Sequence, residues 1–258
     1  MIVRQAIIND LHVPYHDRRV VDLFAGFCEE TQPDEIHYVG DVWDFRSAST
    51  KFKDAPKDLR CSTLEFEVGL GRDLLNRFRD RFPKAKHFFY MGNHEHRLDR
   101  LISTQAPALT GMVTVEGLLP RGFVFLPYGA APRYGQLVIT HGDLVRGKSG
   151  ATAHAMLEKY GSSVIFGHTH RMGKALKTDG SGTLEAWENG CACLLEQPYT
   201  VGPTNWQQGW ALVHNDMRRK FHVDQYRVAG NGYLLGGALN EWSKIKNRIS
   251  RGLVGASC

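Results

Sequence analysis

The hexapeptide FGHTHR, residues 166–171, places His168 and His170 two positions apart, directly after an apolar run and a glycine. Two imidazoles this close together at the end of an apolar segment suit either a polar turn or a pair of metal ligands. Which interpretation holds depends on what stands at the ends of the other apolar segments.

The segment SSVIFGHTH (162–170) is one of five apolar stretches that predict β-strands and end at polar residues. The other four are IVRQAIIND (2–10), DEIHYVGD (34–41), AKHFFYMGN (85–93) and QLVITHGD (136–143). Helical periodicity appears between several of them, at residues 17–30, 59–82 and 149–161. We expect the last of these helices to start from a Ser149 cap and to end at Gly161.

The last third of the chain is rich in strand-like sequence. Residues 174–196 predict strands joined by a Gly-rich turn, and residues 209–228 predict a hairpin. Between the third and fourth predicted strands, residues 98–135 contain several Pro and Gly and are expected to form an ordered loop. Strand–helix alternation followed by further strands is typical of a layered α/β domain with mixed sheets. We expect this domain to span residues 1–230 and residues 231–258 to form a basic C-terminal tail or helix.

The composition is that of an ordinary globular protein. The 258 residues are 42% hydrophobic and 23% charged, which argues against disorder of the whole chain. The net charge of +5 is compatible with an anionic substrate, but it is too small to predict nucleic-acid binding by itself. The five irregularly spaced cysteines suggest no disulfide framework, and no apolar stretch approaches a membrane span. We therefore expect a reduced, soluble, cytoplasmic protein with no membrane partner.

The polar residues at the five strand ends form a chemically coherent set. In open α/β sheets, ligands bind at the carboxyl ends of strands, so neighbouring strands would bring these groups into one cleft. The set contains two carboxylates, one amide oxygen and five imidazoles: Asp10, His12, Asp41, Asn93, His94, His141, His168 and His170. This mixture suits borderline divalent metals such as Mn, Fe, Co, Ni or Zn. There are too many ligands for one ion, whereas two ions that share a carboxylate would use all of them. Metal pairs about 3.5–4 Å apart promote in-line displacement at phosphorus.

Five short motifs carry a family resemblance. They are DLH (10–12), GDVWD (40–44), GNHEHR (92–97), THGD (140–143) and GHTH (167–170). In this order they resemble the motifs of the calcineurin-like metallophosphoesterases. The resemblance implies a layered αββα sandwich of two mixed β-sheets flanked by helices.

The resemblance also implies a role for each motif residue. Asp10, His12 and His170 would hold one divalent ion, and Asn93, His141 and His168 would hold the other. Asp41 would bridge the two ions, and His94 would face the substrate without binding metal. Mn is the expected metal, with Fe, Ni, Co or Zn as alternatives. His168 and His170 would thus bind different ions, and an extended backbone would point both to the same side.

The implied activity is that of a dinuclear-metal-dependent phosphoesterase. A metal-bridging hydroxide would attack phosphorus in line, and protonated His94 would donate to the leaving alkoxide or position the phosphate. Asp44 would orient a ligand imidazole or brace its loop, although a helix cap is an equally good interpretation. Arg97 would bind substrate phosphate, or, as we favour, form a surface ion pair with Asp99 or Glu95.

The substrate is less well specified. We favour phosphodiester or nucleic-acid substrates because residues 45–66 and the C-terminal tail are basic and because NWQQGW (205–210) offers aromatic side chains. The basic residues of the first segment are Arg46, Lys51, Lys53, Lys57 and Arg60. The alternative activity is a phosphomonoesterase for nucleotides or phosphoproteins. A catalytically silent protein-binding scaffold is a third hypothesis, which ligand loss would favour, but every ligand position is filled here.

Two further features lie outside the five motifs. Cys191 and Cys193 alternate along a predicted strand, so we expect one in the core and the other half-exposed. The two Trp residues of NWQQGW, Trp206 and Trp210, are expected either at a strand edge in the core or as an aromatic wall beside the cleft.

Overall fold

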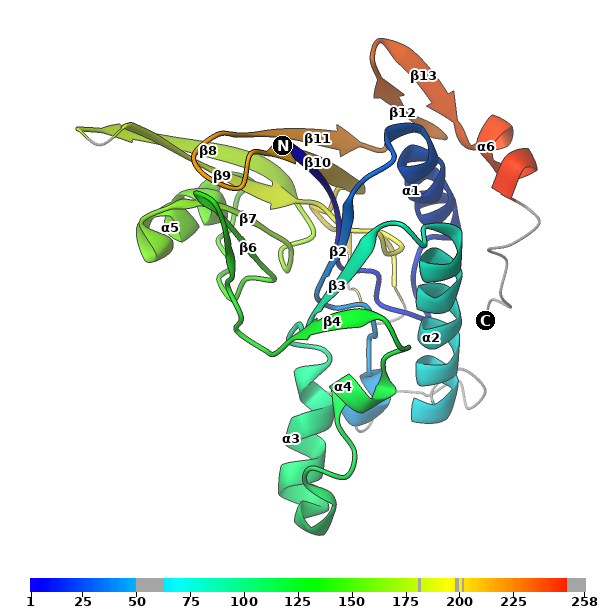
Figure 1. Cartoon of the computed structure of the whole chain (residues 1–258). Helices are drawn as coiled ribbons and strands as arrows, with labels where there is room; N and C mark the ends of the chain where they lie inside the picture. The colour runs from blue at the N-terminus through cyan, green and yellow to red at the C-terminus, as the bar shows by residue number, and fades with distance from the viewer. Residues whose placement is uncertain (50–62, 181, 198–199, 201, 250–258) are drawn as a thin grey trace.

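The computed structural model in Figure 1 describes residues 1–49, 63–180, 182–197, 200 and 202–249. Most of its strands belong to two mixed sheets. The first sheet has the order β11-β10-β1-β2-β3-β4. Its members are β1 (Val3–Ile8), β2 (Glu35–Val39), β3 (Lys86–Tyr90), β4 (Phe123–Leu126), β10 (Gly209–Asn215) and β11 (Phe221–Arg227). Strands β1 to β4 are parallel, and β10 and β11 are antiparallel additions at one side.

The second sheet has the order β5-β6-β7-β9-β8. Its members are β5 (Arg133–Tyr134), β6 (Leu137–Thr140), β7 (Ser163–Phe166), β8 (Met172–Asp179) and β9 (Gly182–Asn189). Strands β6, β7 and β9 are parallel to one another. Strands β2, β6 and β7 are buried along their whole length because both of their faces are covered.

Helices cover the outer faces of both sheets. Figure 1 shows α1 (Arg18–Thr31) and α2 (Leu64–Arg81) on the outer side of β1 to β3, while α5 (Ala151–Tyr160) lies against the second sheet. Three apolar clusters fill the spaces between the layers. Ala6 and Ile8 of β1 join the cluster under α1 and α2, whereas Ile7 joins the cluster between the sheets, as strand alternation requires. The third cluster lies under α5. The predicted αββα sandwich of two mixed sheets is therefore confirmed.

The segment 98–135 differs from the expected ordered loop. It contains most of α3 (His96–Gln105), the 3-10 turn η3 (Pro107–Leu109), α4 (Val115–Leu118), β4 and β5. The sequence pattern missed β4 because its four residues are only partly buried and therefore show no clear alternation. In Figure 1, α3 extends away from the sheets.

The start of α5 differs from the prediction, whereas its end agrees with it. The N-cap of α5 is Gly150, in left-handed backbone with φ 82°, and Ser149 does not cap the helix. Gly161 ends α5 as expected, with its backbone N–H bonded to the carbonyl of Leu157. The preference of glycine for positive φ outweighed the capping propensity of serine at this site.

The C-terminal segment contains a hairpin, β12 (Gly232–Leu235) and β13 (Ala238–Glu241), followed by α6 (Trp242–Ile249). Of the two expectations for this segment, the helix is present at 242–249, and residues 250–258 lie outside the described residues. Trp242 Nε1 donates to Asp22 Oδ2 on α1 at 3.1 Å, and Ile245 is buried in the same core cluster as α1. The division of the chain at residue 230 stays a prediction.

Within the ranges that the structure describes, no helix is both long and apolar enough to cross a membrane.

Candidate metal centre

The carboxyl ends of β1, β2 and β3 in the first sheet and of β6 and β7 in the second meet at one edge of the sandwich. The loops after these strands carry all seven predicted metal ligands, which we call the candidate metal centre: Asp10, His12, Asp41, Asn93, His141, His168 and His170. Sheet pairing sets β1 beside β2 and β6 beside β7, so that loops distant in sequence become neighbours. The structure therefore brings these residues together at one place.

Asp10, His12 and His170 form one group, with one ligand atom of each within 4.8 Å of the others. The Nε2 atoms of His12 and His170 lie 2.9 Å apart, and Nε2 of His170 lies 3.3 Å from Asp10 Oδ1. All three side chains are buried. Three ligand atoms this close together form a group that a cation would complete.

Asp41, His141 and His168 form the second group at the same spacing. Nε2 of His141 lies 3.0 Å from the side-chain oxygen of Asn93 and 3.4 Å from Asp41 Oδ2. Asp41 Oδ2 also lies 3.8 Å from Nε2 of His12, so this carboxylate stands between the two groups. That is the position expected of a ligand shared by two ions.

The backbone of these loops is strained where the ligands sit. Five of the eight non-glycine residues with positive φ in the described part of the chain are predicted ligands: Asp10, His12, Asp41, His168 and His170. Left-handed backbone at a non-glycine residue costs about 1–3 kcal/mol, and such strain concentrates at functional sites. The expected extended backbone at His168 and His170 is therefore wrong. The loop turns at both residues, yet both imidazoles still join the centre.

Two glycines of the motifs are explained by close approach. A Cβ on Gly40 would collide with the His141 ring, and a Cβ on Gly92 would collide with Asp41. Since both neighbours are buried and held in place, only glycine fits at these positions. The glycines of GDVWD and GNHEHR thus allow the ligand loops to pack directly on ligands from other strands.

Asp44 hydrogen-bonds two imidazoles. Its Oδ1 lies 2.9 Å from Nδ1 of His12 and 2.9 Å from Nδ1 of His94. The 3-10 turn η1 (Arg46–Ala48) has Phe45 at its N-cap and no side-chain cap, so Asp44 does not cap this turn. The contact with His12 is the one expected of a carboxylate that orients a ligand imidazole.

Glu95 was not predicted to matter beyond a possible surface ion pair, yet it is completely buried. Its carboxylate accepts hydrogen bonds from the backbone N–H groups of Asp41, Trp43 and Gly92, at 2.8–3.0 Å. Burial and the nearby Asp41 raise the pKa of Glu95 to about 7, despite these hydrogen bonds. The residue joins two ligand loops, and only its place within a ligand motif could have drawn attention to it.

Asn9 and Asn189 form another connection that sequence inspection missed. The side-chain amide of Asn9 donates to Asp10 Oδ2 at 2.5 Å, and the amide of Asn189 donates to Asn9 Oδ1 at 2.8 Å. Oδ2 of Asp10 also accepts from the backbone N–H of His168 at 2.9 Å. Asn189 ends β9, and nothing local in its sequence signals a role at the centre.

His94 and Arg97 lie together beside the centre. Arg97 donates to Nε2 of His94 at 2.7 Å and to the carbonyl of Asp44 at 2.9 Å, rather than forming the favoured surface ion pair with Asp99 or Glu95. Burial lowers the pKa of His94, but Asp41 and Asp44 more than offset this, so its pKa is raised. A protonated Nε2 cannot accept from Arg97, so Arg97 has to leave this nitrogen before His94 can donate from it.

Of the two tryptophans of NWQQGW, one lies in the core and the other lies beside the metal centre, so each of the two expected positions is occupied. Trp210 is completely buried and belongs to the core. Trp206 packs edge-on against His170, with ring centroids 4.3 Å apart. One tryptophan is thus structural, and the other forms a wall at the centre.

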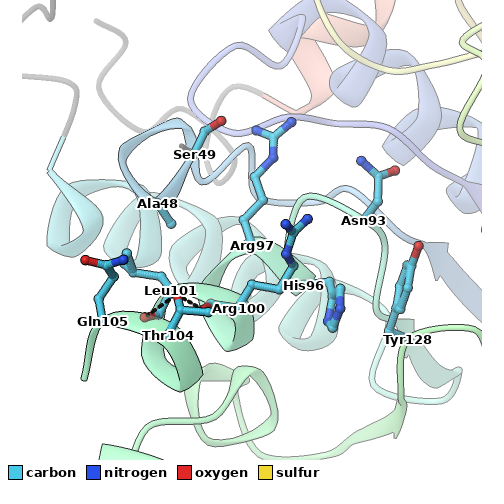
Figure 2. Close-up of a pocket in the computed structure, with 10 residues that line it drawn as sticks. All are labelled: Ala48, Ser49, Asn93, His96, Arg97, Arg100, Leu101, Thr104, Gln105 and Tyr128. Atoms are coloured by element: carbon cyan, nitrogen blue, oxygen red, sulfur yellow. Dashed lines mark hydrogen bonds between the residues drawn. The ribbon is translucent and has the colours of Figure 1, made fainter. Parts of the chain in front are cut away.

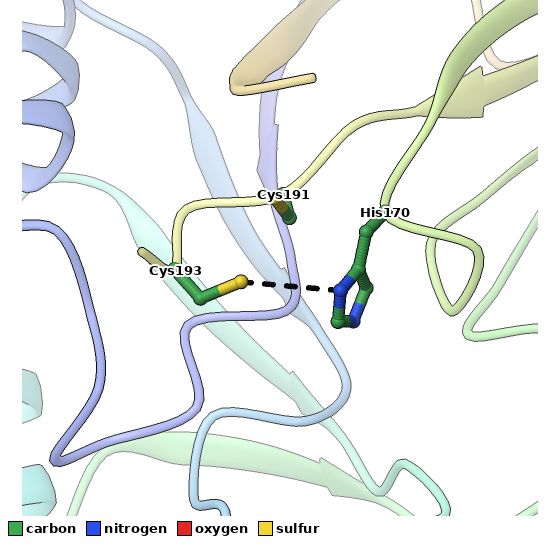
Figure 3. Close-up of side chains that lie close together, drawn as sticks. All are labelled: His170, Cys191 and Cys193. Atoms are coloured by element: carbon green, nitrogen blue, oxygen red, sulfur yellow. Dashed lines mark hydrogen bonds between the residues drawn. The ribbon is translucent and has the colours of Figure 1, made fainter. Parts of the chain in front are cut away.

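Cys191 and Cys193 correct a second expectation. Neither lies in a named strand, because β9 ends at Asn189, and both are buried free thiols. Figure 3 shows both side chains beside His170, with Cys193 Sγ 3.9 Å from His170 Nδ1. The thiols therefore lie on the Nδ1 side of the His170 ring, whereas its Nε2 faces Asp10.

The basic segment 45–66 is only partly visible in the described residues. Arg46 is buried rather than exposed on a rim, and it hydrogen-bonds Tyr15. Lys51, Lys53, Lys57 and Arg60 lie outside the described residues. In the C-terminal helix, Lys244 pairs with Glu241 at 3.2 Å, so this part of the basic tail has a local partner.

The electrostatics of the centre fit a cation. Oδ1 of Asp10 is buried and faces two imidazole nitrogens, Nε2 of His170 at 3.3 Å and Nε2 of His12 at 3.9 Å. Burial together with His94 lowers the pKa of His12 to about 4, so this imidazole is neutral, as a ligand must be. Burial by itself would lower the pKa of His141. The nearby carboxylates Asp41 and Asp10 outweigh this effect and raise the pKa to about 10. A proton on His141 thus balances the two carboxylates, and a metal ion would displace it.

Comparison with known proteins agrees with this geometry. Residues 3–172 match the family model described as calcineurin-like phosphoesterase. The chain belongs to the calcineurin-like phosphoesterase family. Members are in general phosphoesterases that bind two metal ions, and the candidate metal centre brings together Asp and His side chains of the kind that can hold a metal.

Two curated relatives are similar along most of their length. The Gene 54 protein of Mycobacterium phage L5 is 31% identical, and that of Mycobacterium phage D29 is 32% identical. In both cases the match covers 84% of this chain and 90% of the relative. Among solved structures, wild-type Vps29 from Entamoeba histolytica complexed with zinc is similar at a TM-score of 0.46 and 12% identity, covering 93% of this chain and 99% of that one.

Proposed function

We propose that the protein is a dinuclear-metal-dependent phosphoesterase that hydrolyses phosphodiesters, with nucleic acid or nucleotides as the substrate class. The observation that carries the proposal is a pair of ligand groups with Asp41 between them, its Oδ2 3.8 Å from Nε2 of His12. The first group is Asp10, His12 and His170, and Asp41 lies with His141 and His168 in the second. A scaffold that had lost catalysis would have no need for seven ligand-type side chains or for the strained backbone beneath them.

The residues present fit two ions. Asp10, His12 and His170 would hold one, Asn93, His141 and His168 the other, and Asp41 would contact both. Two divalent ions there would bind phosphate oxygens and generate a nucleophile from water near neutral pH. We propose Mn, because a nitrogen-rich set with carboxylates and an amide oxygen suits a borderline metal.

The chain's own residues would do the rest. His94 would donate a proton to the leaving alkoxide, and Asp44 would hold both His94 and His12 in orientation through its two 2.9 Å contacts. Arg97 would release His94 Nε2 and bind a phosphate oxygen of the substrate, because a guanidinium matches phosphate geometry. Trp206 would close the opposite side of the centre against His170.

The compartment is part of the same proposal. Cys28, Cys191 and Cys193 are free thiols, which suits a reducing environment, and we propose the cytoplasm.

The test is a paired assay. The protein is stripped with chelator and reloaded with Mn, and hydrolysis of bis-p-nitrophenyl phosphate is compared with that of p-nitrophenyl phosphate. We expect faster diester cleavage, lost in His141→Ala, together with about two Mn bound per chain. Faster monoester cleavage would favour the phosphomonoesterase alternative. Metal binding without hydrolysis of either substrate would leave the protein-binding scaffold as the better hypothesis.

A further inference from the structure

A pocket of about 390 Å³ opens directly beside the candidate metal centre, and we call it the α3 pocket (Figure 2). It is lined by residues of α3, by the end of η1, by Asn93 and by Tyr128, which follows β4. Asn93 belongs to both sites, since its side-chain oxygen is 3.0 Å from His141. A substrate whose phosphate sits at the centre would therefore extend into this pocket.

The α3 pocket has a positive lining. Arg97 and Arg100 both contribute to it, and among the described residues that line it there is no Asp or Glu. Arg97 is already engaged with His94 and Asp44. Arg100 is exposed, and its guanidinium makes no hydrogen bond or ion pair with the described part of the chain. In Figure 2 the side chain of Arg100 lies near those of Arg97 and His96. It is therefore available to bind an anion.

The pocket also has a flat aromatic wall. The rings of His96 and Tyr128 stack with their centroids 4.4 Å apart and their planes within 6°. Tyr128 is 42% exposed, so it can accept another flat group. Bases stack on aromatic side chains regardless of sequence, and this contact is a main source of affinity for single-stranded nucleic acid.

We propose that the α3 pocket is a nucleotide subsite, in which Arg100 binds the phosphate next to the scissile one and the Tyr128–His96 stack binds the adjoining base. The preferred substrate is then a single-stranded nucleic-acid end, with at least two phosphates, rather than a small diester. This inference rests on the proposed function, because that function puts the scissile phosphate at the candidate metal centre.

The test measures binding by the full-length, metal-free protein, so that no cleavage occurs. The probes are fluorescein-labelled pentathymidylate and an abasic pentamer with the same number of phosphates, followed by fluorescence anisotropy at low salt. We expect the thymidylate to bind about tenfold more tightly than the abasic chain, because only it offers bases to stack. Arg100→Gln should weaken both probes by about five- to tenfold.

The aromatic wall is tested separately. Tyr128→Ala should weaken only pentathymidylate, by about tenfold, and so abolish the preference for bases, while Tyr128→Phe should keep it. Arg219→Gln is the matched charge control, because Arg219 is exposed at the turn after β10, far from α3 in Figure 1. It should leave binding of both probes within about twofold.

Two results would overturn the subsite. One is equal weakening by Arg100→Gln and Arg219→Gln, which would mean that binding is a diffuse charge effect. The other is the absence of a thymidylate preference that depends on Tyr128. Failure of the proposed function is distinguishable, because it shows as no hydrolysis of bis-p-nitrophenyl phosphate with Mn. If binding depended on the bases but no hydrolysis occurred, the α3 pocket would still be a nucleotide subsite, and the proposed phosphodiesterase activity would be wrong.

Discussion

The candidate metal centre and the α3 pocket share Asn93, but they are built in opposite ways. At the centre, Asp10, Asp41 and His12 are almost completely buried, and Asp44 and Glu95 hold the loops through hydrogen bonds. In the pocket, Arg100 and Tyr128 are exposed, and Arg100 has no partner in the described part of the chain. A preorganised centre suits chemistry common to a family, whereas an open wall can change with the substrate at little cost to folding.

The largest effect that this contrast predicts is on stability. Glu95→Ala should leave three buried N–H groups of the ligand loops unsatisfied and lower the free energy of unfolding by about 3–5 kcal/mol. Glu95→Gln should cost less, because its remaining oxygen can still accept. Urea unfolding of the metal-free proteins measures both values. Removal of a pocket side chain, as in Tyr128→Ala, is the control and should cost less than about 1 kcal/mol. If Glu95→Ala and Tyr128→Ala lowered the free energy of unfolding by similar amounts, the metal centre would be no more tightly held than the α3 pocket.

The second prediction separates chemistry from metal binding within the centre. His94→Ala should keep the metal content of the wild type but slow turnover by about 10²-fold for diesters with poor leaving groups, because general-acid catalysis is then lost. The loss should be smaller for p-nitrophenolate, which leaves without protonation. Metal analysis and kcat for both kinds of ester check this. If the variant lost metal as well, His94 would belong among the ligands.

The third and smallest effect concerns Glu67 of α2, which is buried and hydrogen-bonds the backbone of Phe45 and Ser47, close to Asp44. Burial, and then Asp44, raise the pKa of Glu67 to about 7 from an ordinary value of 4.5. Because the folded state disfavours the carboxylate, wild-type stability should fall as the pH rises from about 4.5 to 7, and the cost should be complete above pH 7. Glu67→Gln removes this ionisation, so its stability relative to wild type should rise by about 1–3 kcal/mol between pH 4 and pH 8.

Urea titrations of both metal-free proteins at several pH values would measure this difference. A constant offset between them would mean that Glu67 ionises normally in the folded state.

Much of the architecture could be predicted from apolar patterns. The strands β1, β2, β3, β6 and β7 were recognisable because each carries a short, mainly apolar stretch, as expected of strands covered on both faces. The helix α1 was recognisable from its amphipathic spacing. In contrast, β4 is short and half-buried, and the N-terminus of α5 depends on a glycine in left-handed backbone. Elements whose stability comes from neighbours rather than from their own pattern were missed or misplaced.

The sequence by itself determined which residues gather at the centre, because each ligand directly follows a strand and parallel strands end at a common edge. It could not determine what stands behind those ligands. Asn189 and the two thiols of Cys191 and Cys193 reach the centre only through pairing of distant strands and loops. Glu95 lies within a ligand motif, but its hydrogen bonds to the loop after β2 are not encoded by any local pattern. The α3 pocket is likewise a product of tertiary structure, since Arg100 and Tyr128 are ordinary surface residues until α3 and the loop after β4 bring them together.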